Sequence, residues 1–160
     1  MHNIATRLCL LAAGLSVWLT EFTFAADQKP GTQIATKLTV AVEHDGEKKD
    51  VEVRYLQFLP ENYTSDGKAL PLILFLHGSG ERGTNIDLVK KWGPPRIVEK
   101  KKELPFIVIS PQCPSGRGWD TQELLTLVEH TLKTLNADSN RVAMLKGLFT
   151  ALTLTVSVTG

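Results

Sequence analysis

The chain has 160 residues, a length that predicts one domain. Charged residues make up 22% of it and the formal net charge is +1, so the composition indicates neither a nucleic-acid partner nor a strongly charged substrate. A hydrophobic content of 42% is ordinary for a soluble globular protein.

The N-terminus has the pattern of a signal peptide. Residues 1–7 carry one positive charge, residues 8–19 are mostly apolar, and residues 23–25 (Thr-Phe-Ala) place small side chains at −3 and −1 of a cleavage site. The apolar run is short for a membrane span. We therefore expect residues 1–25 to be removed and the protein to be secreted or periplasmic, without a stable membrane span. An uncleaved N-terminal anchor is the alternative.

Cleavage after Ala25 would remove Cys9 and leave Cys113 as the only cysteine. The mature chain would then form no internal disulfide, although its destination is oxidising. No cluster of His and Cys has metal-ligand spacing, so we expect no structural zinc.

The chain after the signal segment begins with a polar linker, residues 26–33, followed by a domain at residues 34–160. Residues 37–42 and 51–58 are rich in β-forming side chains, and Asp45-Gly46 between them is a turn favoured in tight hairpins. We therefore expect the domain to open with an antiparallel hairpin.

A buried strand is expected at residues 72–76, where Leu-Ile-Leu-Phe-Leu follows a proline and precedes a loop with three glycines. Residues 86–101 favour a helix that is interrupted around residues 93–95 (Gly-Pro-Pro), because proline disrupts a regular helix. A second buried strand is predicted at residues 104–110, with a loop at residues 111–119.

A further helix is expected to start after Asp120, with Glu123 completing a capping-box pattern, and to be closed by residues 137–140. Strand, helix, strand and helix in succession predict a parallel sheet covered by helices. The side chains expected on the buried face of this helix are Leu124, Leu125, Val128, Leu132 and Leu135.

The loop at residues 78–83 (Gly-Ser-Gly-Glu-Arg-Gly) literally matches the dinucleotide pattern G-x-G-x-x-G. A histidine precedes the loop, no helix plainly begins within it, and the next strand ends in Ser110 where an acid that binds ribose would stand. Export would also separate the protein from cytoplasmic cofactors. These features count against a dinucleotide site.

Residues 77–80 (His-Gly-Ser-Gly) match the HGxG oxyanion loop of α/β-hydrolases better. In acyl transfer a carbonyl oxygen becomes an oxyanion, and preorganised backbone N–H groups stabilise it. Glycines let this backbone approach the reacting group closely. The predicted oxyanion-hole residues are Gly78, Ser79 and Gly80.

The likeness extends over residues 54–63, 72–83, 93–95 and 106–119, the last with a Ser-Pro-Gln-Cys-Pro core. Together they resemble the secreted esterases of the α/β-hydrolase superfamily, within the phospholipase/carboxylesterase and polyhydroxybutyrate-depolymerase-like branch. The resemblance implies an α/β-hydrolase fold and hydrolysis of a small-molecule or polymeric carboxylic ester. The reaction would use a serine nucleophile, a histidine base and an acidic partner, without a metal or organic cofactor. His77 and Trp119 are candidates for the substrate mouth, although a histidine in such a loop is more often structural and a tryptophan beside a helix cap more often packs.

The sequence departs from the family after residue 142. The family continues into a strand that carries the nucleophile elbow G-x-S-x-G, but no such motif occurs here, and after Gly147-Leu148 the serine position holds Phe149. Catalytic nucleophile, acid and base are therefore not identifiable. We expect an incomplete, truncated N-terminal half of the fold that is inactive, arising from a frameshift, an insertion or a true chain end.

Two alternatives to an esterase remain open from the sequence. One is an exported, non-catalytic domain that binds an ester, lipid or glycan in the same crevice, and the other is a non-functional gene fragment. Residues 152–159 alternate apolar and hydroxyl side chains, which predicts a half-exposed strand rather than a central parallel one.

Overall fold

The structure, a computed structural model, describes residues 28–147 and 150–152. The predicted signal peptide, Phe149 and most of the predicted last strand lie outside these residues. None of the helices within them is long and apolar enough to cross a membrane.

A mixed six-stranded sheet with the order β1-β2-β4-β3-β5-β6 forms the centre of the molecule. Strands β3, β4 and β5 are mutually parallel where they pair, while β1, β2 and β6 join by antiparallel pairing. The strand bounds are β1 Thr32–His44, β2 Glu47–Leu59, β3 Leu70–Leu76, β4 Ile107–Pro111, β5 Ala137–Lys146 and β6 Thr150–Leu152.

The predicted hairpin is confirmed and is longer than expected. Its strands β1 and β2 pair from Thr32↔Leu59 to His44↔Glu47, so β1 begins inside the segment assigned to the linker. Asp45 and Gly46 form the turn with φ values of 53° and 80°. Positive φ at both central residues is the geometry that a two-residue hairpin turn needs, and it explains why an Asp-Gly pair stands here.

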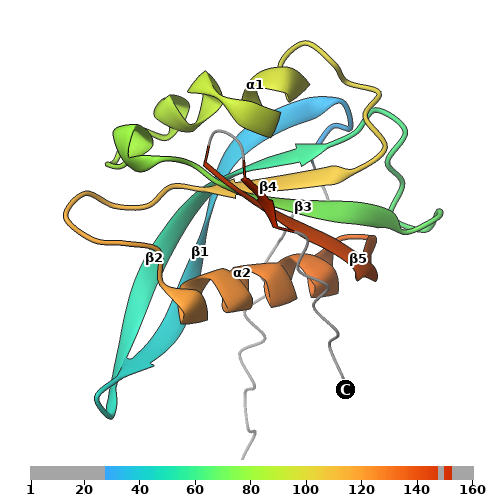
Figure 1. The fold of residues 1–160 in the computed structure, drawn as a ribbon. Helices are drawn as coiled ribbons and strands as arrows, with labels where there is room; N and C mark the ends of the chain where they lie inside the picture. Colours follow the sequence, from blue (N-terminus) through green and yellow to red (C-terminus); the bar gives the residue numbers. More distant parts are fainter. Residues whose placement is uncertain (1–27, 148–149, 153–160) are drawn as a thin grey trace, which may run out of the picture.

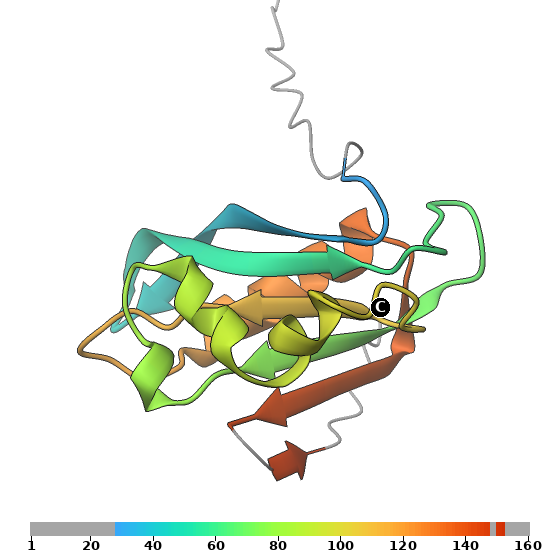
Figure 2. The same ribbon diagram turned by 90° about the horizontal axis from the view of Figure 1, so that it is seen from above.

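Helices cover both faces of the sheet, as Figures 1 and 2 show. The 3-10 helix η2 (Ile86–Lys91) and α1 (Gly93–Val98) lie on one face, and α2 (Thr121–Thr134) lies on the other. The predicted interruption at residues 93–95 is confirmed. The prolines do not simply break a helix, however, because they occupy the first turn of α1, where their missing N–H groups need no partner.

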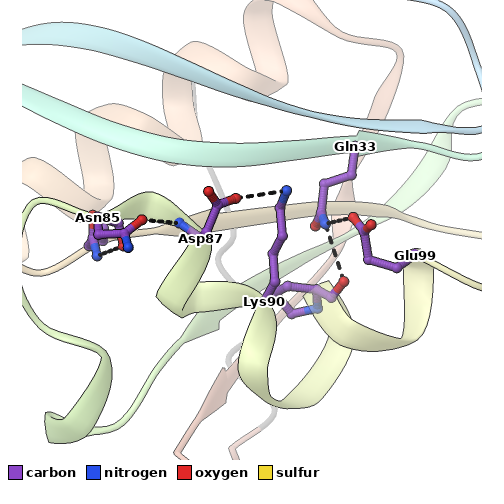
Figure 3. Close-up of polar contacts among 7 residues, drawn as sticks. Gln33, Asn85, Asp87, Lys90 and Glu99 are labelled. Atoms are coloured by element: carbon purple, nitrogen blue, oxygen red, sulfur yellow. Dashed lines mark hydrogen bonds and ion pairs between the residues drawn. The ribbon is translucent and has the colours of Figure 1, made fainter.

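Polar contacts attach this helical layer to the edge strand β1 (Figure 3). The Gln33 amide donates to the Glu99 carboxylate at 2.7 Å and to the Pro95 carbonyl at 3.2 Å. Asn85 caps η2 by accepting from the Asp87 N–H, and Lys90 pairs with Asp87 at 3.0 Å. The Gln33 contacts hold α1 beside β1, and the other two contacts stabilise η2 itself.

The main core lies between the sheet and α2, and a smaller one lies under α1. Leu127 is fully buried on α2, whereas Leu125, predicted to be buried, is 48% exposed. The prediction for Leu125 was wrong because α2 crosses the sheet with the face that carries Leu127, Val128 and Thr131 turned inward. Residues 137–140, predicted to close the helix, instead begin β5.

Gly93 is the glycine that the packing requires most clearly. It has a φ of +62°, and a Cβ added there would lie 2.6 Å from the Phe75 ring in β3. Both effects disfavour any side chain at this position.

We expect Gly93→Ala to lower the free energy of unfolding by about 2–4 kcal/mol, because it adds backbone strain and overpacking. Urea denaturation measures this change. Gly116→Ala is the control for strain alone, since φ is +81° with open space around it, and Gly118→Ala is the control with neither effect. Equal losses in all three variants would contradict the account.

Candidate active site

The loop at residues 77–83 begins where β3 ends, at the carboxyl edge of the parallel strands. Gly78 is extended, and Ser79–Glu81 form one turn of 3-10 helix, η1. The first N–H groups of such a turn have no partner within it. Residues 78–80 are exposed, so the backbone predicted to bind an oxyanion faces solvent at the sheet edge.

His77 lies beneath this loop rather than on its surface, with 4% of its area exposed. Its Nε2 accepts a hydrogen bond from the Cys113 N–H at 3.0 Å, and its Nδ1 lies 2.6 Å from the Gly78 carbonyl oxygen. An imidazole whose Nε2 accepts must carry its proton on Nδ1, which then donates to Gly78. His77 is therefore a neutral ring that joins two loops, and neither nitrogen remains for proton transfer.

Burial lowers the pKa of His77 below its ordinary value of 6.5. The hydrogen bond to the Gly78 carbonyl and the charge of Glu81 act in the opposite direction and are smaller. The pKa shift agrees with the hydrogen bonds, because a cationic ring could not accept from Cys113.

The loop after β4 holds the loop after β3 through three further hydrogen bonds. Gly83 N–H donates to the Cys113 carbonyl at 3.0 Å. The buried Gln112 amide donates to the carbonyls of Glu81 at 3.1 Å and Asn85 at 2.6 Å. Sequence reasoning gave Gln112 no role, although it stands in the Ser-Pro-Gln-Cys-Pro segment that carries the family resemblance.

The loop that carries Trp119 is attached to the first turn of α2. Arg117 pairs with Glu123 at 2.8 Å in the first turn of this helix, and the Cys113 thiol donates to the Arg117 carbonyl at 3.4 Å. Asp120 caps the helix as predicted, by accepting from the Glu123 N–H at 3.0 Å. The Glu123 carboxylate, which the capping-box pattern assigned to the cap, binds Arg117.

Trp119 and His77 come together in the structure. Their rings meet edge to face with centroids 4.8 Å apart. The Trp119 side chain is only partly buried. The interpretation of this pair as a substrate mouth stays a prediction, with Trp119 the member that solvent reaches.

The other polar side chains near the loop have different surroundings. Glu81 is buried, and its Oε2 lies 3.3 Å from the point where a Gly78 Cβ would stand, so the bare glycine makes room for it. Arg82 is exposed. Ser110 is completely buried, out of reach of a substrate.

The end of β5 lies beside this loop. Leu76 pairs with Lys146, and the Gly147 N–H donates to the Leu76 carbonyl at 2.8 Å. Gly147 has a φ of +67°, so the chain turns sharply here. Within the described residues, no group of three or more His, Cys, Asp or Glu side chains could hold a metal ion.

No protein-family model and no curated protein matches the chain. Solved structures that resemble it include a thermostable esterase (25% identity, TM-score 0.48), covering 69% of this chain and 34% of that one. Others are a bacterial heroin esterase (21%, 0.45, covering 76% and 37%) and a ferulic acid esterase from the anaerobic fungus Anaeromyces mucronatus (14%, 0.42, covering 74% and 53%). The chain thus spans about a third to a half of their length.

The fold assignment itself rests on the strand order. An antiparallel strand beside β4, followed by β3 and β5 in parallel, with helices on both faces, is the arrangement of the first part of an α/β-hydrolase. The loop after β3 is the one that supplies an oxyanion-hole N–H in this fold. The chain therefore has the strand order expected for the N-terminal part of an α/β-hydrolase fold.

We expect the stability of the protein to fall as the pH drops from 7 to 5.5. A histidine whose folded pKa is lowered binds fewer protons when folded than when unfolded, so folding is favoured above the unfolded pKa of about 6.5 and loses stability below it. Burial lowers the pKa of both His77 and His130.

Urea denaturation as a function of pH tests this prediction. His77→Gln and His130→Gln should each flatten the dependence, and the double variant should flatten it most. If His77→Gln keeps the slope of the unaltered protein, the buried neutral imidazole is refuted.

Proposed function

We propose that this chain is part of a serine-type carboxylic ester hydrolase and that residues 78–80 supply its oxyanion-binding N–H groups. One observation carries the proposal: the register Leu76↔Lys146 puts the loop after β3 beside the turn after β5. In an α/β-hydrolase, the oxyanion hole combines an N–H from the first loop with one from the residue after the nucleophile, which follows the second strand.

The geometry of the loop supports this role. Its N–H groups start a 3-10 turn and lie exposed at the sheet edge. His77 and Gln112 hold the loop through hydrogen bonds to the Gly78 and Glu81 carbonyls. Preorganised donors of this kind stabilise an oxyanion without reorganising during the reaction. The chemistry would be attack on an ester carbonyl, with negative charge developing on its oxygen between the two donors.

The 160 residues themselves should hydrolyse esters at a rate near background. They contain no G-x-S-x-G, and the described residues near the loop offer no serine with a free base, since both nitrogens of His77 are bound. The second N–H of the oxyanion hole belongs to the residue after the nucleophile, so without that motif the loop lacks its partner donor as well as an attacking group.

Incubation with p-nitrophenyl acetate and with a serine-directed fluorophosphonate measures this expectation. We expect turnover indistinguishable from buffer and no covalent label. Rapid turnover or stoichiometric labelling would show a nucleophile that the proposal does not contain.

The family assignment has a separate test in the nucleotide sequence beyond codon 142, read in all three frames. The proposal expects a G-x-S-x-G codon run there, followed by codons for an acid and a histidine. A sequence without them would favour the exported non-catalytic domain or the gene fragment.

We also propose export, on the basis of residues 1–25. N-terminal sequencing of protein recovered outside the cytoplasm should begin at Ala26. Recovery of chains that begin at Met1 would contradict cleavage.

A further inference from the structure

A cavity of about 320 Å³ opens between α2 and the face of the sheet formed by β3 and β5. A volume of this size is typical of the smaller ligand pockets in proteins. The apolar side chains come from both layers and leave a concave space that the described chain does not fill. The residues that line it are Leu74, Leu76, Trp119, Thr121, Leu124, Leu125, Val128, Val142, Met144 and Lys146.

Charge distinguishes one end of this cavity from the rest. Of the side chains that line it, Lys146 alone is charged, and it is exposed at the end of β5. Within the described part of the chain its ammonium makes no ion pair. Thr121 supplies the only hydroxyl of the lining. An apolar wall with one cation at its rim complements a ligand with a hydrocarbon chain and a single anionic head.

The cavity adjoins the loop after β3. Leu76, in its wall, directly precedes His77, and Trp119, also in its wall, contacts the His77 ring edge to face. A ligand in the cavity therefore contacts Leu76 and Trp119, the two residues that adjoin the His77 ring.

We propose that this cavity binds a medium-chain aliphatic carboxylate, with its hydrocarbon chain between α2 and the sheet and its carboxylate on Lys146. The proposal does not rest on the proposed ester-hydrolase function. No bond forms or breaks in the cavity. The site is distinct from the N–H groups of residues 78–80.

The volume limits the length of the chain. A water-sized group occupies about 30 Å³, and a methylene is of similar size, so the cavity accepts roughly eight to ten carbons. Each methylene that leaves water should tighten binding about fourfold. Affinity should therefore rise from hexanoate to octanoate and decanoate and then level off.

Isothermal titration calorimetry of the 160-residue chain with these three carboxylates tests the proposal. Lys146→Met keeps the apolar stem but removes the charge, and it should weaken octanoate binding about three- to fivefold while binding of 1-octanol changes less than twofold. Lys101→Met, at an exposed lysine outside the cavity lining, is the matched control and should change neither.

A second variant tests the apolar wall. Leu125 is half exposed, so Leu125→Glu leaves the core intact and places a negative charge in the cavity, where it should abolish octanoate binding. Circular dichroism and thermal melting confirm that each variant is folded.

Three results would overturn the proposal. They are no binding up to the solubility limit of decanoate, binding that neither variant alters, and a dimer in light scattering that Leu125→Glu dissociates, which would assign the cavity to a second copy of the chain. Because binding needs no nucleophile, these outcomes are independent of the ester-hydrolysis and nucleotide-sequence tests.

Discussion

The hydrogen bond from the Cys113 N–H to His77 Nε2 is the contact on which the candidate site depends. It joins the loops after β3 and β4, which lie side by side because the two strands are adjacent and parallel. The acceptor is buried, so water does not compete for the bond and its loss would leave two polar groups unpaired. A neutral ring is required, and burial favours that form.

The same histidine ring also connects the exposed loop to the buried residues beneath it. His77 reaches the Gly78 carbonyl through its other nitrogen, so the ring holds the extended residue from which the 3-10 turn starts. Gln112 holds the far end of the turn at the Glu81 carbonyl. With both ends fixed, the first N–H groups of the turn are held in place before any reaction begins. Stabilisation of a developing charge requires such preorganised donors.

Much of the fold around the candidate site could be predicted from local sequence patterns. The Asp45-Gly46 turn, the buried run in β3 and the Asp120 cap each depend on neighbouring residues, and the structure contains all three. The position of residues 77–80 at a strand end followed from the same patterns.

What the sequence did not reveal depends on contacts between distant segments. The neutral form of His77 is decided by a backbone group 36 residues away, and the role of Gln112 by carbonyls 27 and 31 residues away. The exposure of Leu125 follows from how α2 rotates against the sheet, which helical spacing alone does not determine to within one residue. The cavity beside Lys146 likewise forms only when α2 packs across β3 and β5.

The tautomer of His77 can be measured directly. Long-range ¹H–¹⁵N correlation spectra of the imidazole at pH 7 distinguish a protonated Nδ1 from a protonated Nε2 and from the cation. The two hydrogen bonds of the ring predict a neutral imidazole with its proton on Nδ1, together with a Cys113 amide proton coupled to Nε2. A proton on Nε2, or a charged ring at this pH, would contradict this prediction.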